Sequence, residues 1–284
     1  MKKPPIPKEQ MYEVRPGQSI ELLKELHILT RDGKMNQDSR RKLKQIYHLM
    51  QFIEPLLDEL RLQQPQLDIV DHGAGKSYLG FIMHDLYIRP HAAGSRIHGI
   101  ERRAELVERS QALATRLGFD DMQFHALSVA DSITSPLLPA RPDMVTALHA
   151  CNTATDDAID FALKKQAQAI VLVPCCQAEV AATLRHHKAA ALARGALGEL
   201  WRHPLHTREF GSHVTNVLRC LQLEAHGYQV SVTELVGWEH SMKNELIIAR
   251  RSPGRPQPQA AQRLNELLTS LGLEELKTRF YAPI

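Results

Sequence analysis

The sequence predicts an α/β fold: a doubly wound, mostly parallel sheet of seven strands, preceded by an N-terminal helical extension. From Leu67 onward, short apolar runs alternate with amphipathic segments, which is typical of a parallel sheet covered by helices on both faces. The stretch GWEHSMKN between the last two runs is too short for a helix, so we expect those strands to pair antiparallel. A glycine turn follows the first run directly.

The N-terminal part, residues 18–62, has the pattern of helices. Between Leu43 and Leu60, apolar residues recur at steps of three and four, the period of a helix that buries one face. Gly33 should end an earlier helix of about residues 19–29, and Pro55 should kink or divide the later one. A basic cluster lies between them, formed by Arg40, Arg41, Lys42 and Lys44. Such a cluster is either a solvated helix face or a surface for a polyanion.

The elements of the sheet can be placed from the alternation of patterns. Strands are predicted at 67–71, 96–101, 122–126, 143–150, 168–174, 228–236 and 244–250. Helices are predicted at 75–88, 102–117, 154–166, 176–194 and 213–226. Gly118 and Gly227 should terminate two of these helices. The chain therefore divides into an extension (1–64), a main domain (65–252), and a proline-rich linker with a C-terminal helix (253–284).

Composition excludes several classes of protein. No run approaches the roughly eighteen apolar residues of a membrane span, and the start MKKPPIPKEQMYEV lacks the apolar stretch of a secretory signal. Four cysteines do not make a disulfide framework, so we expect a cytoplasmic, reducing environment. The net charge of +3 permits a polyanionic partner without requiring one.

The turn after the first strand, in LDIVDHGAGKSYLG, has the form of a cofactor loop, because glycines let backbone approach a ligand closely. A dinucleotide fingerprint would need glycine where Tyr78 stands, and a nucleotide phosphate loop would need glycine where Val70 stands. The remaining pattern, a strand ending in aspartate and then GxG, indicates S-adenosylmethionine (AdoMet). We expect cofactor contacts at Asp71, Gly73, Ala74, Gly75 and Lys76.

The ribose of such a cofactor needs an acceptor at the end of the next strand. Glu101 stands there, followed by Arg102, and we favour the ribose role over the alternative that Glu101 only begins a helix. After the third strand, Ser128 and Val129 are candidates to enclose the adenine, although an ordinary loop would have the same sequence.

Reactive side chains follow the fourth and fifth strands, and the carboxyl ends of these strands should meet near the cofactor. We list the candidate catalytic residues as His149, Cys151, Asn152, Cys175, Cys176, Lys243 and Asn244. His149 is the best candidate for a general base and also for the cofactor pocket, although a buried histidine bonded to backbone is an equal alternative. Lys243 and Asn244 either reach the substrate or form an exposed turn.

The cysteines allow three interpretations. Cys175 or Cys176 could attack a pyrimidine ring, but no partner acid lies nearby in sequence. A zinc site with His149 and Cys151 has suitable ligand types but lacks CxxC spacing. Small apolar lining of a cofactor pocket is the favoured interpretation, so we expect no metal. The absence of NPPY after the fourth strand argues against exocyclic-amine methylation.

Several strings together resemble a known family: DHGAGKSYL, HGIERRAELVERS, LHACNTATDDAID, VPCCQ and EHSMKNELIIA. They are similar to the methyltransferase-domain family that includes glutathione-S-transferase-C-terminal-domain-containing proteins and relatives of tRNA ribose 2'-O-methyltransferases. The resemblance covers about residues 40–251 and implies AdoMet contacts at Asp71, Gly73, Gly75 and Glu101. It also implies a reaction pocket lined by His149, Cys151, Cys175 and Cys176. The sequence departs at Ala74, often cysteine, and Ser77, commonly glycine, and it lacks the tRNA enzymes' cysteine-rich zinc segment.

These observations predict a class I, Rossmann-like AdoMet-dependent methyltransferase whose catalytic domain is the main domain. We expect RNA (tRNA or rRNA) as the methyl acceptor, bound through the basic cluster. The alternatives are a protein or small-molecule acceptor, and a non-catalytic AdoMet-fold module that binds RNA or a partner.

Overall fold

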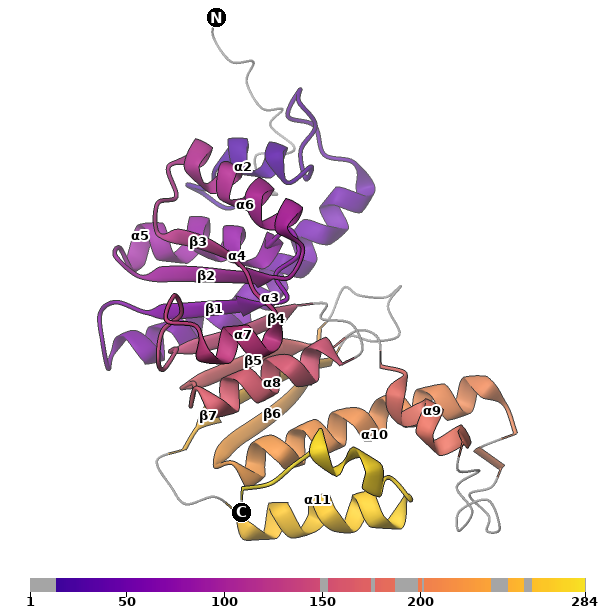
Figure 1. The fold of residues 1–284 in the computed structure, drawn as a ribbon. Helices are drawn as coiled ribbons and strands as arrows, with labels where there is room; N and C mark the ends of the chain where they lie inside the picture. The colour runs from indigo at the N-terminus through magenta and orange to yellow at the C-terminus, as the bar shows by residue number, and fades with distance from the viewer. Residues whose placement is uncertain are drawn as a thin grey trace, which may run out of the picture. The chain divides into compact units, whose positions relative to one another are not determined.

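The computed structural model describes residues 14–148, 153–174, 177–186, 199–200, 202–235, 245–252 and 257–283. One sheet has the strand order β3-β2-β1-β4-β5-β7-β6 (Figure 1). Its strands are β1 (Asp68–His72), β2 (Arg96–Glu101), β3 (Met122–Ala126), β4 (Met144–Leu148), β5 (Ala169–Val173), β6 (Tyr228–Glu234) and β7 (Glu245–Arg251). β1 and β3 both pair parallel with β2, whereas β7 runs antiparallel to β5. The predicted fold class is confirmed.

Most of the described helices lie within the predicted ranges. They are α2 (Ile20–Glu25), α3 (Gln37–Arg61), α4 (Tyr78–Met83), the π-helical η1 (His84–Ile88), α5 (Arg89–His91), α6 (Ala104–Leu117), α7 (Val129–Thr134), α8 (Ala154–Lys164), α9 (Glu179–His186), α10 (Pro204–Ala225), α11 (Pro258–Ser270) and the 3₁₀ helix η3 (Glu274–Thr278). Pro55 does not divide α3, α7 stands where a loop was expected, and α10 begins earlier than predicted. None of these described helices is long and apolar enough to cross a membrane.

The described residues fall into two compact units, and the first contains 14–144 with 234–235. Its N-terminal extension is part of the packing, since Leu22 and Leu23 of α2 are fully buried. The backbone N–H of Ser19 donates to the Asp85 carboxylate at 2.8 Å, which ties the start of α2 to η1. Gly118 ends α6 in the left-handed conformation, as the sequence predicts.

The second unit holds the remaining described residues, among them α8 to α11. α9, α10, α11 and the C-terminal segment share one apolar core, which includes Leu184, Leu218, Leu268 and Phe280 (Figure 1). α9 and α10 approach so closely at Gly211 that an added Cβ would lie 2.6 Å from the Cβ of Ala181. The residues after the proline-rich linker therefore pack on the helices that follow β5.

Candidate functional site

The glycine loop, residues 73–77, leaves β1 in a conformation that depends on glycine. Gly73 and Gly75 have φ angles of 69° and 57°, in the left-handed region that side chains rarely adopt. A Cβ added at Gly75 would meet no atom within 4 Å, so the loop faces open space there. A ligand can therefore approach the backbone at this position.

The glycine loop is held against the end of β2 by two hydrogen bonds. The Gly75 N–H donates to Oε2 of Glu101 at 3.1 Å. The Ala74 N–H donates to the carbonyl oxygen of Ile100 at 2.9 Å. The structure thus brings together two predicted cofactor residues, Gly75 and Glu101, from different strand ends.

Asp71 supports the glycine loop from within the protein. Its side chain is buried, and its Oδ2 accepts a hydrogen bond of 2.9 Å from the hydroxyl of Ser77. Ser77 is also left-handed, with φ 50°, and a Cβ at Gly80 would lie 2.4 Å from the Ser77 hydroxyl. Ser77 and Gly80 shape the loop, and neither role was predicted from the sequence. The small residue three positions after Ser77 was the available signal.

The Glu101 carboxylate accepts hydrogen bonds on both oxygens. Besides Gly75, its donors are the backbone N–H of Arg103 at 3.0 Å and two guanidinium nitrogens of Arg103 at 3.0 and 3.2 Å. Burial raises the pKa of Glu101, but the hydrogen bonds and charge of Arg103 lower it by more, so the pKa lies below its usual value. Glu101 is therefore an ionised acceptor. The Arg103 guanidinium contacts both oxygens of Glu101, and its side chain is 59% exposed, so water can replace it there.

None of the other described cofactor candidates donates a hydrogen bond to the Glu101 carboxylate. Arg102 is exposed, and Lys76 lines a cavity of about 320 Å³ with residues of α2 and α6. Ser128 is the N-cap of α7: its hydroxyl oxygen accepts from the Asp131 N–H at 3.2 Å, and Val129 begins the helix. This capping explains Ser128 locally. Contact of Ser128 and Val129 with adenine stays a prediction.

The candidate catalytic residues all lie outside the described residues; they are His149, Cys151, Asn152, Cys175, Cys176, Lys243 and Asn244. Their roles stay predictions. The remaining cysteine, Cys220, has its pKa raised to about 12, first by burial and then by Glu224 and Glu245. It is a thiol at neutral pH and a poor nucleophile. Within the described part of the chain, no group of three potential ligands is placed to hold a metal.

The residues at this strand end fit an AdoMet-type cofactor. The glycine loop offers open space beside backbone at Gly75, where an amino-acid moiety can lie. Glu101 supplies an ionised acceptor directly beside that backbone, as a ribose requires. Both features depend on the geometry of the described residues.

Comparison with known proteins gives one family match. The model of the family described as "Methyltransferase domain" matches residues 41–183, half of the chain. No curated protein matches the chain in sequence.

Three solved structures illustrate the likeness in fold. Precorrin-6y C5,15-methyltransferase from Geobacter metallireducens is 21% identical, with 70% of this chain and 86% of that one covered and a TM-score of 0.36. Magnesium protoporphyrin IX methyltransferase from Synechocystis with bound SAH is 16% identical, with 83% of this chain and 95% of that one covered and a TM-score of 0.43. An rRNA methylase from Streptococcus thermophilus is 10% identical, with 66% of this chain and 87% of that one covered and a TM-score of 0.38. At these values the likenesses carry no argument about the acceptor.

Proposed function

We propose that this chain, which belongs to the methyltransferase-domain family matched over residues 41–183, methylates RNA. It is an AdoMet-dependent methyltransferase. The proposal concerns the acceptor, and it extends to the contacts that hold the cofactor and to action in the cytoplasm.

We assign cofactor binding to the glycine loop and Glu101. When bound, AdoMet would supply the methyl group of its sulfonium, which passes to the acceptor atom by in-line displacement while the sulfur leaves as a neutral thioether. The backbone at Gly73 and Gly75 would receive the amino-acid end, and Glu101 would accept from the ribose once Arg103 has moved aside. His149 is our candidate to take a proton from the acceptor. Orientation by these groups accounts for most of the expected acceleration.

The observation that carries the RNA acceptor is the exposure of the whole basic cluster. Arg40, Arg41, Lys42 and Lys44 are all exposed on the first half of α3, while Leu43 between them is buried. The carboxylate of Asp38 lies 3.6 Å from the Arg41 guanidinium, and both side chains are largely solvated, so this pair is weak. The helix therefore presents net positive charge to solvent, which suits a phosphate backbone. The resemblance to tRNA ribose methyltransferase relatives points the same way.

The test is transfer of isotope from methyl-labelled AdoMet to total RNA, total protein and a small-molecule extract. We expect label in RNA. Replacing all four cluster residues by Gln should lower that label about tenfold or more at moderate salt and leave AdoMet affinity unchanged. The matched control replaces four other exposed cations, Arg185, Arg208, Arg263 and Lys277, and should keep the label.

Other results would overturn the proposal in different ways. Label found only in protein or only in small molecules would show that the acceptor is not RNA, but the chain would still be a methyltransferase. Label in no fraction, together with measurable AdoMet binding, would favour a non-catalytic module. An equal loss of label in the cluster variant and its control would show that the basic cluster has no specific role in binding RNA.

A further inference from the structure

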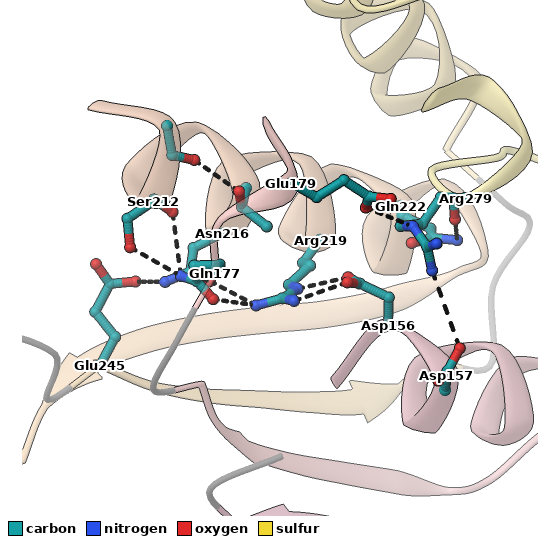
Figure 2. A network of polar contacts seen from close by, with 12 residues as sticks. Asp156, Asp157, Gln177, Glu179, Ser212, Asn216, Arg219, Gln222, Glu245 and Arg279 are labelled. Carbon is teal, nitrogen blue, oxygen red and sulfur yellow. Dashed lines mark hydrogen bonds and ion pairs between the residues drawn. The ribbon is translucent and has the colours of Figure 1, made fainter. Parts of the chain in front are cut away.

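Arg219 of α10 is fully buried in the second unit, and every donor nitrogen of its guanidinium has a partner (Figure 2). Nε and Nη2 donate to the two carboxylate oxygens of Asp156 at 2.6 and 2.8 Å. Nη1 donates to Oε1 of Gln177 at 2.5 Å and to Oδ1 of Asn216 at 3.1 Å. The two-pronged contact with Asp156 is the geometry that orients a carboxylate most strictly.

The contacts continue outward through two amides. The Gln177 amide nitrogen donates to Oδ1 of Asn216 at 2.9 Å and to the Ser212 hydroxyl and carbonyl at 3.2 Å each. The Asn216 amide nitrogen donates to Oε2 of Glu245 at 2.5 Å. We call Asp156, Gln177, Ser212, Asn216, Arg219 and Glu245 the Arg219 network. Because both amides donate and accept, neither can rotate without losing contacts.

Three members of the Arg219 network stand where candidate catalytic stretches end in the sequence. Asp156 lies in the first turn of α8, four positions after Asn152. Gln177 follows Cys176 directly, and Glu245, the first residue of β7, follows Asn244 directly. The same buried cation and its amides thus hold a described residue that follows each of these stretches in the sequence.

We infer that Arg219 is a positioning residue for methyl transfer: through the Arg219 network it fixes Asp156, Gln177 and Glu245, which follow the three candidate catalytic stretches in the sequence. This inference rests on the methyltransferase activity and on the predicted roles of those stretches, and it is independent of the RNA acceptor. Stability alone does not explain such a network, since a buried ion pair can often be replaced by apolar residues without loss of stability. What the network adds is one defined geometry.

The test reverses the hydrogen bond in which the Asn216 amide donates to the Glu245 carboxylate. Asn216→Asp keeps the Oδ1 acceptor that Arg219 and Gln177 use, but it sets a second carboxylate against Glu245. Adding Glu245→Gln puts an amide donor opposite the new carboxylate at position 216 and restores the hydrogen bond in reverse. Glu245→Gln alone keeps an oxygen that can accept from the Asn216 amide, so hydrogen exchange at 153–157 and 177–180 should stay within about twofold of wild type. All variants are made in the full chain.

Two readouts separate positioning from general stability. We expect kcat for label transfer in N216D to fall about tenfold or more, with AdoMet affinity by calorimetry within about twofold of wild type, and to recover in the double variant. We also expect faster backbone hydrogen exchange at 153–157, 177–180 and 245–247, about tenfold or more, and its recovery in the double variant. The matched control is Tyr228→Phe, which removes a buried 2.7 Å hydrogen bond to Ala167 in the same unit.

Each result decides the inference. If N216D lowers kcat only in step with its folded fraction, or speeds exchange throughout the second unit as Y228F does, the Arg219 network is merely structural. Failure of the double variant to recover would equally overturn positioning through Glu245. If the wild type transfers label to no acceptor, the proposed function fails. The exchange pattern still shows whether the Arg219 network stabilises the backbone around Asp156, Gln177 and Glu245.

Discussion

The glycine loop of the first unit and the Arg219 network of the second both depend on a carboxylate–arginine contact, but they differ in access to water. Arg103 is 59% exposed where it contacts Glu101, whereas Arg219 is fully buried against Asp156. Water can replace the guanidinium of Arg103 at low cost, because an exposed ion pair contributes little. No water can replace Arg219, since its partners are buried with it. The contact at Glu101 can therefore be replaced by solvent, whereas the contacts of Arg219 have no such replacement.

The largest effect should come from breaking the buried pair. Arg219→Met leaves the Asp156 carboxylate buried without its cation, so the free energy of unfolding should fall by about 3–5 kcal/mol. Urea denaturation followed by circular dichroism measures this. Arg116→Met, which removes an exposed pair with Glu25, is the control and should cost less than about 1 kcal/mol. Similar losses in the two variants would contradict the distinction between the regions.

The next effect concerns the glycine loop. Gly75→Val places a branched side chain where the ligand should approach, so AdoMet affinity should drop about 100-fold or more in calorimetry. Gly118→Val is a matched control, because Gly118 also has a positive φ, 68°, with no atom near its Cβ position. Both variants carry a similar backbone cost. Retained affinity in Gly75→Val would refute the loop assignment.

A third prediction concerns the pH dependence of stability. His84 is buried in the first unit, and neither of its ring nitrogens has a hydrogen-bond partner among the described residues. Burial, followed by the charge of Arg89, lowers the pKa of His84 to about 4 from 6.5. The unfolded chain then binds a proton at higher pH than the folded one, so this stability is full above pH 6.5 and is lost toward pH 4. From pH 7.5 to 5, His84 should account for a loss of about 2 kcal/mol. His72, with its pKa also lowered to about 4 by burial, acts in the same direction.

The measurement is urea unfolding of His84→Leu and wild type at both pH values. The variant should lose about 2 kcal/mol less on acidification. Equal losses in the two proteins would show that His84 titrates normally in the folded state.

The smallest expected effect is at Arg103. Arg103→Met frees two acceptor positions on Glu101, so AdoMet should bind more tightly, by at most about fivefold because the contact is exposed. Calorimetry with Glu101→Gln as the companion variant, which should weaken binding, checks the assignment. Weaker binding in Arg103→Met would mean that Arg103 itself contacts the cofactor.

Much of the first unit was predictable because its signals are local. The bounds of β2 and β3 agree with the predicted 96–101 and 122–126, and both strands mix apolar with polar residues over a short span. α7 escaped prediction because six residues give no periodic pattern, although the spacing of Ser128 and Asp131 is a helix-start signal. The early start of α10 was missed because its first turns carry few apolar residues and pack through Gly211 against α9.

In the candidate site, too, the residues that follow local sequence patterns were predicted and the others were not. Gly75 and Glu101 could be paired from sequence, because parallel strands place successive strand ends side by side. Arg103 as the partner of Glu101 was not expected, since the pattern named only its neighbour Arg102. Arg219 gave no signal at all: it lies 63 positions from Asp156 and 42 from Gln177.

The sequence by itself determined the α/β class, the glycine turn and the acidic residue that faces it, because each follows from spacing along a single strand or turn. Only the tertiary structure decided that Asp71 supports the loop through Ser77. Only the tertiary structure, too, decided that Arg219 contacts Asp156 and Gln177 and reaches Glu245 through Asn216 (Figure 2). The physical reason is that a buried charge is tolerated only with partners on every side. Those partners come from elements that packing, and not sequence spacing, brings together.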